Sequence, residues 1–373
     1  MLKRRTLAAA ALAALLLPMA ASAADPVPLG AVEVLTGPTA AYGTAAKAGL
    51  DLALEAINGK GVLGGRKLSL TVEDSAGTKD GAINAMRKLI GRDKVVALIG
   101  PTLSNEMFAA GPVANARGIP TIGTSTTANG ITDIGPFIFR TAMPEADVIP
   151  VTMRKAAARG AKTIALMYAN DDAFSKSGFE VMQKAAATAG LQIVATESFA
   201  SKDTDFSAQL TKIKALKPDA IGISALVEPV SGVLLQARQL GFGAETQFVG
   251  GNGSNSPKLA AIAGAAAEGM LVGSPWFVAK PDAANQAFVA AFQSKYGKVP
   301  DQFAAQAYDT LFILAEAIDR AGEADPAKIR DALTKTEHTG ALGPFRFGEN
   351  RSPAATEGVV VLELHDGAFR IAP

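Results

Sequence analysis

Short apolar runs alternate with longer amphipathic stretches along most of this chain. In its first third, strand-like runs occupy 27–35, 67–73 and 95–99, and apolar residues at helical spacing occupy 45–58 and 81–90. Strands that alternate with helices in this way are typical of a parallel sheet. The pattern therefore predicts an α/β fold with a doubly wound, Rossmann-like sheet and right-handed crossovers.

A second series of the same kind follows after residue 160. Strands are expected at 163–168, 192–197, 220–226 and 247–249, and helices at 178–189, 206–216 and 229–240. Farther on, we expect strands at 270–273, 342–347 and 358–364 and helices at 283–296, 303–321 and 326–335. We interpret the polar stretch 169–177 as a loop, and the segment between Pro144 and Pro150 as a linker, because proline interrupts regular structure.

Two similar α/β series in 373 residues predict two lobes, since one hydrophobic core seldom extends over so long a chain. We place lobe 1 at 24–143 plus 275–350 and lobe 2 at 144–274 plus 351–373. The chain then crosses between the lobes three times. Three crossings make a hinge, which suits closure of the two lobes around a ligand in the manner of a flytrap.

Hydroxyl-bearing turns follow two neighbouring strands of the first series. The buried run 95–99 ends at Gly100-Pro101 and passes through Thr102 and Ser104 into a helix expected at 106–117, and the next strand, 119–122, ends in the turn 123–127. Polar turns between a buried strand and a helix offer unpaired N–H groups to an anion. Two such turns together suggest one carboxylate site. Serine and threonine also cap helices, so both explanations stay open.

Composition and charge exclude several classes of function. The 36 basic and 35 acidic residues give a formal charge of +1, which is no electrostatic case for nucleic acid or an anionic membrane as partner. The absence of cysteine excludes disulfides, thiol catalysis and thiolate metal sites. Only His338 and His365 remain for a metal site or a catalytic triad, and no glycine-rich phosphate loop is present. We expect no catalytic residues, no metal and no cofactor.

The N-terminus has the pattern of a secretory signal peptide. Lys3-Arg4-Arg5 precedes an apolar run at 7–17, and Ala21-Ser22-Ala23 provides a small-residue cleavage site. The apolar run is too short for a membrane anchor. We expect removal of residues 1–23 and export to the periplasm, which leaves 33 basic against 35 acidic residues, a charge of −2.

Taken in order, these features resemble the type I periplasmic solute-binding proteins of the branched-chain amino acid transport group, the relatives of leucine/isoleucine/valine-binding protein. The resemblance covers essentially the whole mature chain. Its marks are Thr36-Gly37-Pro38, Tyr42-Gly43, Asp74, Leu98-Ile99-Gly100, Gly118-Ile119-Pro120, Phe139-Arg140-Thr141, Asp205-Phe206, Gln236-Ala237-Arg238 and Glu268-Gly269. Each mark is short, but their order and spacing together are specific.

The resemblance implies which residues bind a ligand. In that family a serine and a threonine at the first-lobe strand ends hold the ligand's carboxylate, and the matching residues here are Ser104 and Thr127, with Ser125 nearby. Tyr42 matches a residue that packs beside the ligand. The chain departs from the family pattern at Phe174 and Leu226, where two tyrosines are replaced, and at Asn252, where amino acid binders carry an acid. Trp276 is a further ring candidate, although aromatic residues more often belong to the core. The family's first-lobe disulfide is also missing, at Ala76 and Leu103.

The departure at Asn252 bears on the ligand, because a buried ammonium without an anionic partner costs on the order of several kcal/mol. We therefore expect an aromatic or 2-oxo acid, delivered by a monomeric binding protein to the permease and ATPase of an ABC importer. The alternative is a branched-chain or other hydrophobic amino acid, if Glu228, Asp171 or Asp172 reaches the ammonium. An exported ligand-sensing subunit would share this fold and site.

Overall fold

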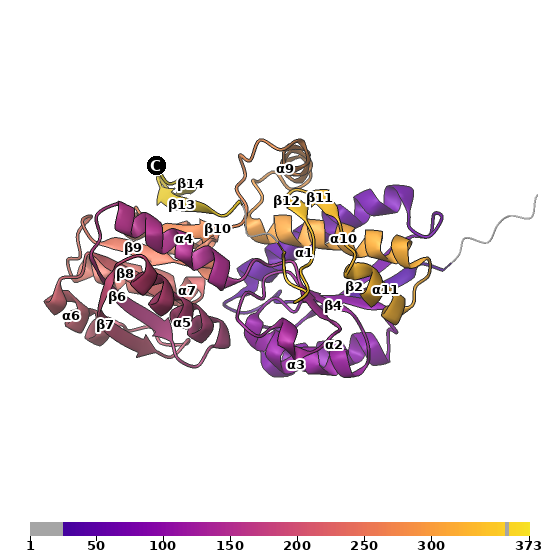
Figure 1. The fold of residues 1–373 in the computed structure, drawn as a ribbon, viewed down its shortest axis with the longest axis horizontal. Coiled ribbons are helices and arrows are strands. Elements are labelled where there is room, and N and C mark those ends of the chain that lie inside the picture. The colour runs from indigo at the N-terminus through magenta and orange to yellow at the C-terminus, as the bar shows by residue number, and fades with distance from the viewer. Residues whose placement is uncertain (1–24, 355–357) are drawn as a thin grey trace, which may run out of the picture.

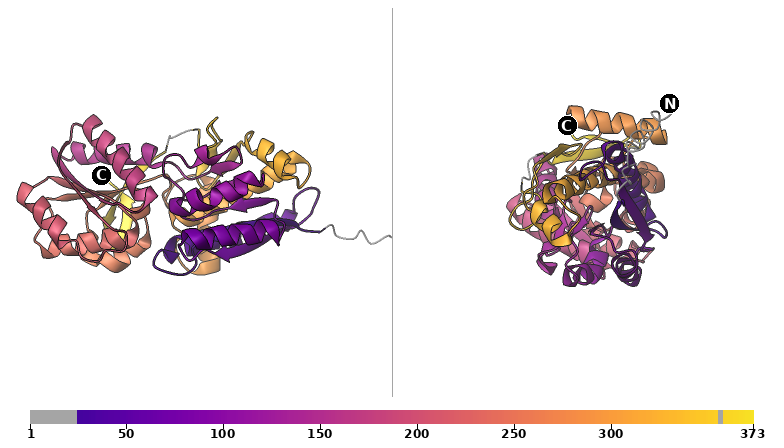
Figure 2. Two further views of the ribbon diagram at one scale, coloured as in Figure 1. Left: turned by 90° about the horizontal axis from the view of Figure 1, so that it is seen from below. Right: turned by 90° about the vertical axis from the view of Figure 1, so that its right-hand side faces the viewer.

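The computed structural model describes residues 25–354 and 358–373, which form two α/β lobes that lie side by side (Figure 1). The predicted signal peptide at 1–23 and part of the predicted third crossing lie outside the described residues. Figure 2 shows the lobes end to end along the long axis, with the C-terminus on the second lobe. Within the described ranges, no helix has both the length and the apolarity needed to cross a membrane.

The first lobe contains a five-stranded sheet in the order β2-β1-β3-β4-β5, in which all neighbouring strands are parallel. Its strands are β1 (Val27–Glu33), β2 (Leu68–Asp74), β3 (Ala97–Ile99), β4 (Thr121–Gly123) and β5 (Ile138–Arg140). The strands β3, β4 and β5 are fully buried, as expected for a parallel sheet covered on both faces. The predicted doubly wound parallel sheet is confirmed.

The second lobe contains a seven-stranded sheet in the order β14-β13-β10-β9-β8-β6-β7. Its parallel strands are β6 (Thr163–Ala169), β7 (Gln192–Phe199), β8 (Ala220–Ser224), β9 (Gln247–Gly250) and β10 (Leu271–Ser274). The strands β13 (Val360–His365) and β14 (Ala368–Ile371) extend one edge in antiparallel fashion. Counted from β6, the parallel part repeats the strand order of the first lobe, so the two lobes share one architecture.

Helices cover both faces of the first sheet. The helices α1 (Ala40–Lys60), α10 (Gln302–Ala321) and α11 (Pro326–Leu333) pack on one face, and α2 (Lys79–Gly91) and α3 (Ser104–Ala116) on the other. The contact between α1 and α10 requires a glycine, because a Cβ atom on Gly49 would lie 2.1 Å from the carbonyl oxygen of Ala304. The helix α9 (Ala283–Tyr296) and the hairpin of β11 (His338–Gly340) and β12 (Gly343–Phe345) complete this lobe.

The second sheet is covered in the same way. The helices α4 (Glu145–Ala158) and α5 (Ala173–Thr188) pack on one face, and α6 (Ser207–Leu216) and α7 (Val227–Gln239) on the other. A short helix, α8 (Pro257–Ala263), lies beside α7. Single 3-10 turns occur at η1 (Thr132–Ile134), η2 (Asn252–Ser254) and η3 (Gly264–Ala267). The sequence pattern predicted neither α8 nor β14, since with seven and four residues they are too short to show a clear periodicity.

The predicted linker between Pro144 and Pro150 was wrong, because this segment forms the start of α4. Pro144 occupies the position before the first helical residue, where its fixed backbone φ angle suits the start of a helix. Pro150 lies inside the helix and cannot donate to the carbonyl of Ala146. Ala146 is exposed, so water can satisfy that carbonyl and the helix tolerates the proline.

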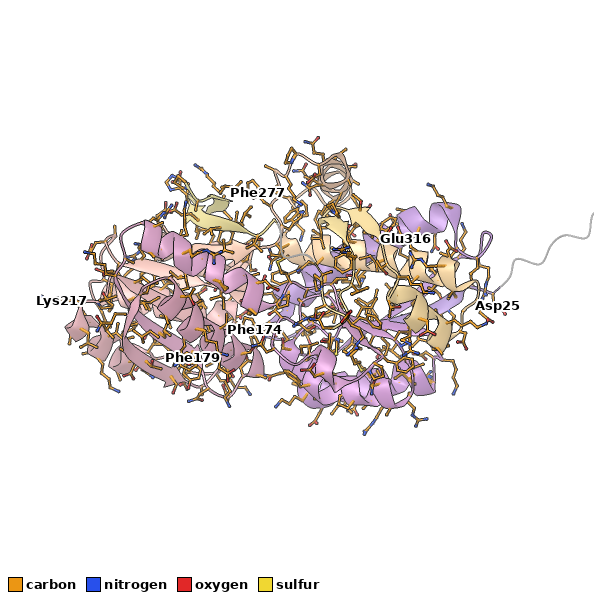
Figure 3. The ribbon with its side chains drawn as sticks, viewed as in Figure 1. Asp25, Phe174, Phe179, Lys217, Phe277 and Glu316 are labelled. Atoms are coloured by element: carbon orange, nitrogen blue, oxygen red, sulfur yellow. The ribbon has the colours of Figure 1, made fainter. Side chains whose placement is uncertain are left out.

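The predicted loop at 169–177 was also wrong in part, because α5 begins at Ala173. Asp172 caps this helix: its carboxylate accepts hydrogen bonds from the backbone N–H and the hydroxyl of Ser175, both at 2.7 Å. The cap places Phe174 on the first turn of a helix rather than on a loop. In Figure 3, Phe174 lies on the side of the second lobe that meets the first.

The chain passes between the lobes after β5, after β10 and before β13. Near the third passage, the backbone carbonyl of Arg351 accepts from the N–H of Arg140 at 3.1 Å, and the hydroxyl of Ser352 accepts from the Arg140 side chain at 2.8 Å. Both contacts tie residues 351–352 to the first sheet. The lobe boundaries at 143/144, 274/275 and 350/351 stay a prediction, and these contacts favour a third crossing that begins a few residues later.

Candidate functional site

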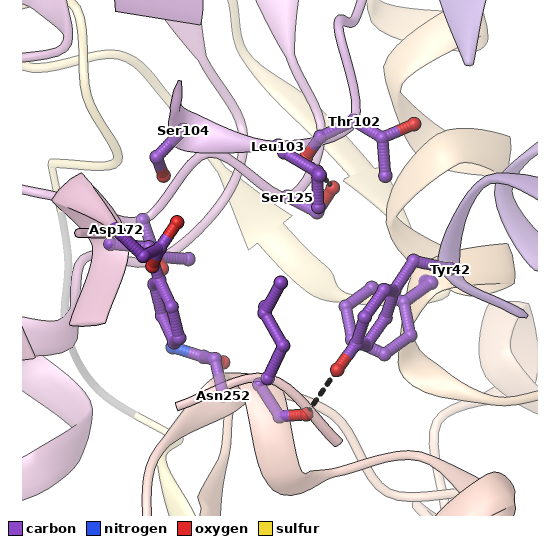
Figure 4. Close-up of a pocket in the computed structure, with 12 residues that line it drawn as sticks. Tyr42, Thr102, Leu103, Ser104, Ser125, Asp172 and Asn252 are labelled. Carbon is purple, nitrogen blue, oxygen red and sulfur yellow. Dashed lines mark hydrogen bonds between the residues drawn. The ribbon is translucent and has the colours of Figure 1, made fainter. Parts of the chain in front are cut away.

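A cavity lies between the lobes, at the carboxyl ends of strands in both sheets. In each lobe the strand order is 2-1-3, so the connection from strand 1 to strand 2 and the connection from strand 2 to strand 3 run in opposite directions across the sheet. This reversal opens a crevice at the carboxyl end of strand 1. The two lobes contribute one crevice each. The cavity is lined by Tyr42, Thr102, Leu103, Ser104, Ser125, Thr127, Asp172, Phe174, Leu226, Asn252, Gly253 and Phe303 (Figure 4).

Ser104 provides a hydroxyl on the first-lobe wall. It is the first residue of α3 and is 2% exposed. Its oxygen accepts a hydrogen bond from the backbone N–H of Ala128 at 3.3 Å, and among the described residues its own proton has no acceptor. The Ser104 hydroxyl therefore can donate into the cavity, next to the positive end of the α3 helix dipole.

Ser125 contributes through its backbone rather than its side chain. Its hydroxyl donates to the carbonyl of Thr102 at 2.7 Å, so this proton is already used. In the part of the chain that the structure describes, the N–H groups of Ser125 and Thr127 donate to no protein acceptor. With Ser104 they form a group of donors suited to a carboxylate, and no lysine, arginine or histidine lines the cavity.

Asn252 lies on the second-lobe wall and reaches into the cavity in Figure 4. Its backbone N–H donates to the buried carboxyl of Glu145 at 3.1 Å, and its side-chain Nδ2 donates to the carbonyl of Met143 at 3.4 Å. Its Oδ1 atom is buried and has no hydrogen-bond partner among the described residues. A buried acceptor without a partner is costly, so this atom calls for a donor from a ligand or a water molecule.

Tyr42 joins the two lobes across the cavity. Its hydroxyl donates to the carbonyl of Gly253 at 2.6 Å and accepts from the backbone N–H of Val227 at 2.9 Å. Burial raises the pKa of Tyr42 well above its usual value, so the hydroxyl stays protonated. Its ring packs edge-on against Phe303, with 4.9 Å between the ring centres. The described conformation is therefore one in which the lobes are closed.

Apolar side chains form the rest of the wall. Phe174 and Leu226 come from the second lobe, and Leu103 and Phe303 from segments of the first. Gly253 allows Phe174 to lie against the backbone, because a Cβ atom at this position would be 2.9 Å from two carbons of the ring. The cavity thus has a polar end near Ser104 and an apolar remainder, which suits a small carboxylate with a hydrophobic body.

Asp172 is the one carboxylate among the lining residues, and its oxygens are already engaged. One oxygen accepts two hydrogen bonds from Ser175, and the other accepts from the side chain of Asn105 across the cleft. Burial raises the pKa of Asp172, although the hydrogen bonds from Ser175 oppose this effect. The other two acids considered for an ammonium lie elsewhere: Glu228 pairs with Lys258 at 2.7 Å, and Asp171 binds Ser201.

The structure brings seven of the eight predicted site residues to the cavity and places Trp276 elsewhere. Trp276 is 4% exposed and packs edge-on against Phe288 in a separate core cluster. Its indole N–H donates to the side chain of Asn285 at 2.7 Å. The expectation that Trp276 meets the ligand is corrected, since its polar atom and its ring both have partners in the core.

The sequence placed Thr102 in the first hydroxyl-bearing turn but did not name it as a ligand contact. It did not name Leu103, Gly253 or Phe303 either, and it considered Asp172 only as an alternative. Leu103 was noted because a cysteine is missing there, and the same position presents a side chain to the cavity. Phe303 lies on the first turn of α10, far from the other site residues in the sequence. Its ring could be placed only from the packing of α10 beside α1.

Comparison with known proteins agrees with this geometry. Residues 26–368 match the family described as "Periplasmic binding protein". The chain is 31% identical over 351 residues to the leucine-, isoleucine-, valine-, threonine- and alanine-binding protein of Pseudomonas aeruginosa, covering 93% of this chain and 92% of that protein. The leucine-binding protein LivK of Thermotoga maritima has a similar structure, with a TM-score of 0.88, 28% identity, and coverage of 93% of this chain and 98% of that one.

A solute-binding protein from R. palustris in complex with benzoate has the same fold, with a TM-score of 0.84 and coverage of 93% of this chain and 95% of that one. At 23% identity this likeness concerns the fold alone. Two lobes with matching sheets and a cavity between them are the arrangement found in solute-binding proteins such as LivK. The chain belongs to the periplasmic binding protein family, of the type that serves ABC importers.

The contacts of Tyr42 across the cavity predict that ligand binding changes the shape of the molecule. We expect the ligand-free protein in solution to be open on average, and a carboxylate ligand at saturating concentration to shift it to the closed form. Small-angle X-ray scattering should then record a smaller radius of gyration with the ligand than without it. An unchanged radius under saturation, checked by calorimetry, would contradict closure of the lobes.

Proposed function

We propose that this protein is exported to the periplasm as a monomer, captures a small carboxylate between its lobes and delivers it to the permease and ATPase of an ABC importer. The proposed ligand is an aromatic acid or a related acid without an ammonium group. Ser104, Ser125 and Thr127 hold the carboxylate, and Tyr42, Phe174, Leu226 and Asn252 surround the rest of the ligand.

The observation that carries this proposal is the neutral amide at position 252. A ligand ammonium buried against Asn252 would meet no acid in the cavity wall there, because the carboxyl of Glu145 lies behind the wall and accepts from Thr127 and from the backbone of Asn252. Burying an ammonium without a direct partner costs on the order of several kcal/mol. Asp172 is the remaining acid of the lining, and donors of the protein already occupy both of its oxygens. An acid without an ammonium avoids this cost while it keeps the contacts of its carboxylate and its apolar body.

The unpaired Oδ1 atom of Asn252 refines the choice between 2-oxo and 2-hydroxy acids. A ketone oxygen is an acceptor and cannot satisfy another acceptor, whereas a hydroxyl can donate to it. Of the two protons on the side-chain nitrogen of Asn252, one is donated to the carbonyl of Met143 and the other faces the carboxyl of Glu145. We therefore favour a 2-hydroxy acid or a hydroxyl-bearing aryl acid over the 2-oxo acid that the sequence suggested together with aromatic acids.

A branched-chain amino acid is the second candidate, and a specific observation favours it. Asp172 lies in the cavity wall, and three donors leave its carboxylate with room for one more. The P. aeruginosa relative is named for amino acids that include leucine, isoleucine and valine. An ammonium that reaches Asp172 would restore amino acid binding in spite of the amide at Asn252.

Calorimetry with matched ligands separates the two candidates. Phenyllactate, phenylpyruvate and phenylalanine share a ring and a carboxylate and differ only at the α-carbon, and benzoate and leucine extend the comparison. We expect phenyllactate to bind at least about tenfold more tightly than phenylalanine, or about 1.4 kcal/mol, with phenylpyruvate between them. If phenylalanine or leucine binds more tightly than each of the other acids, the amino acid is the ligand and the proposed class is wrong.

A further inference from the structure

Glu145 is a buried acid directly behind the cavity wall, and its contacts reach both lobes. It is the first residue of α4 in the second lobe and is fully buried. Its backbone N–H donates to the carbonyl of Thr127 in the first lobe at 3.1 Å. Its carboxyl accepts from the hydroxyl of Thr127 at 3.3 Å and from the backbone N–H of Asn252 at 3.1 Å. Both partners line the cavity, from opposite sides.

The hydroxyl of Thr127 has one proton, and two carboxylates compete for it once a ligand is bound. While Glu145 is ionised, the hydroxyl of Thr127 donates this proton to Glu145, so the proton is not available to the ligand. If Glu145 is protonated, its own O–H can donate to the oxygen of Thr127, and the Thr127 proton then turns to the ligand's carboxylate. Protonation also removes one of two negative charges that would otherwise lie on either side of the same threonine.

We propose that Glu145 is a positioning residue that takes up a proton from the solvent when a carboxylate ligand binds, so that Thr127 can donate to the ligand. This inference rests on the proposed function, since a ligand with an ammonium group brings its own positive charge and needs no such proton. The proton goes from the buffer to a carboxylate oxygen of Glu145, and no other bond forms or breaks. Glu145 itself does not line the cavity.

The surroundings of Glu145 fit a group that changes charge near neutral pH. Burial raises the pKa of Glu145 to about 7, against hydrogen bonds from Asn252 and Thr127 that lower it. Three acids lie on the elements around Glu145. On its own helix Asp147 is attracted by Arg140 of β5, Asp172 on α5 is held by Asn105 and Ser175, and Asp301 caps α10. None of the described ion pairs supplies a counter-charge to Glu145.

A second buried acid provides a matched control. Glu33 ends β1 and accepts from the hydroxyl of Thr102, which also lines the cavity. Burial raises the pKa of Glu33 to about 8. Glu33 therefore titrates in a similar range and also lies behind a lining threonine, but Thr102 uses its proton on Glu33 while the neighbouring Ser104 remains available as a donor. We expect proton uptake to depend on Glu145 and not on Glu33.

Calorimetry with benzoate tests the proposal when it is repeated at pH 8 in buffers of different ionisation enthalpy. We expect the wild type and Glu33→Gln to take up about half a proton to one proton per benzoate, and to bind several-fold more tightly at pH 6 than at pH 8. Glu145→Gln keeps an acceptor for Asn252 and gains a donor for Thr127, so it imitates the protonated acid. It should bind benzoate with no proton uptake and with an affinity independent of pH.

Several outcomes would overturn the proposal. Uptake that persists in Glu145→Gln, or that disappears in Glu33→Gln, would assign the proton to another group, and benzoate binding without uptake in the wild type would remove the role altogether. Binding of leucine but not benzoate would instead show that the ligand class is wrong.

A ligand-free measurement guards against failure of any one ligand. Because the pKa of Glu145 is raised in the folded protein, this residue should stabilise the folded wild type at low pH. Its contribution to the free energy of unfolding should be lost as pH rises from about 4.5 through about 7. Melting temperatures of the wild type and Glu145→Gln should therefore diverge across this range. If the melting temperatures of both proteins change with pH in the same way, the proposal is overturned even without a ligand. If Glu145→Gln does not fold, Thr127→Val, which removes the shared hydroxyl, should still abolish most of the pH dependence of benzoate affinity.

Discussion

Ser104→Ala and Thr127→Val are each expected to weaken benzoate binding by roughly 1–3 kcal/mol, about 5- to 150-fold. Each substitution removes a hydroxyl that can donate to the ligand's carboxylate and leaves the charged group short of a partner. Ser104 has its proton free for this role, whereas Thr127 must first be released by Glu145. Calorimetry at pH 6, where Glu145 is mostly protonated, should show the full effect of both changes.

Thr126 offers a matched control for these variants. It is buried beside Thr127, and its hydroxyl has no hydrogen-bond partner among the described residues and does not line the cavity. Thr126→Val should therefore leave benzoate affinity unchanged within about twofold. Methyl benzoate, which lacks the charge, should bind much more weakly than benzoate to the wild type. Equal binding of the acid and its ester would show that the carboxylate is held elsewhere.

The alternation of strands and helices was enough to predict the architecture, because it depends on local periodicity. Apolar runs such as Ala97–Ile99 are buried on both faces of a parallel sheet, and this leaves a strong pattern in the sequence. The meeting of the two hydroxyl-bearing turns followed from topology, whereas the choice of Ser104 and Thr127 within them came from the family resemblance. Both residues come after neighbouring parallel strands, so their turns meet at one edge of the sheet.

The parts that were not predicted depend on contacts between distant segments. Glu145 was hidden in a segment interpreted as a linker, and its partner Asn252 lies 107 residues farther along the chain. Trp276 carried the general signal of an aromatic residue near a crossing, but packing against Phe288 determined its place. No local pattern distinguishes a tryptophan in a binding site from one in the core.

The contact between Glu145 and Asn252 changes how the ligand preference should be tested. The family resemblance implies an acid at position 252 in amino acid binders, so Asn252→Glu alone would seem to provide an ammonium partner. Here the new carboxylate would lie next to the buried carboxyl of Glu145, whose oxygens are 3.1 and 3.4 Å from the backbone nitrogen of Asn252. Two acids this close cannot both ionise without a cost, so one of them would stay protonated.

The double variant Glu145→Gln/Asn252→Glu moves the acid from behind the wall to the wall itself and keeps one acid in this region. We expect it to shift the preference from phenyllactate toward phenylalanine by about 10- to 100-fold relative to the wild type, or about 1.4–2.8 kcal/mol. Asn252→Glu alone should shift the preference less and should melt at a lower temperature. Calorimetry of the four proteins of this cycle with both ligands measures the coupling between the two positions. If Asn252→Glu alone gives the full shift, Glu145 does not restrain the charge at position 252, and the amide is the sole determinant of ligand class.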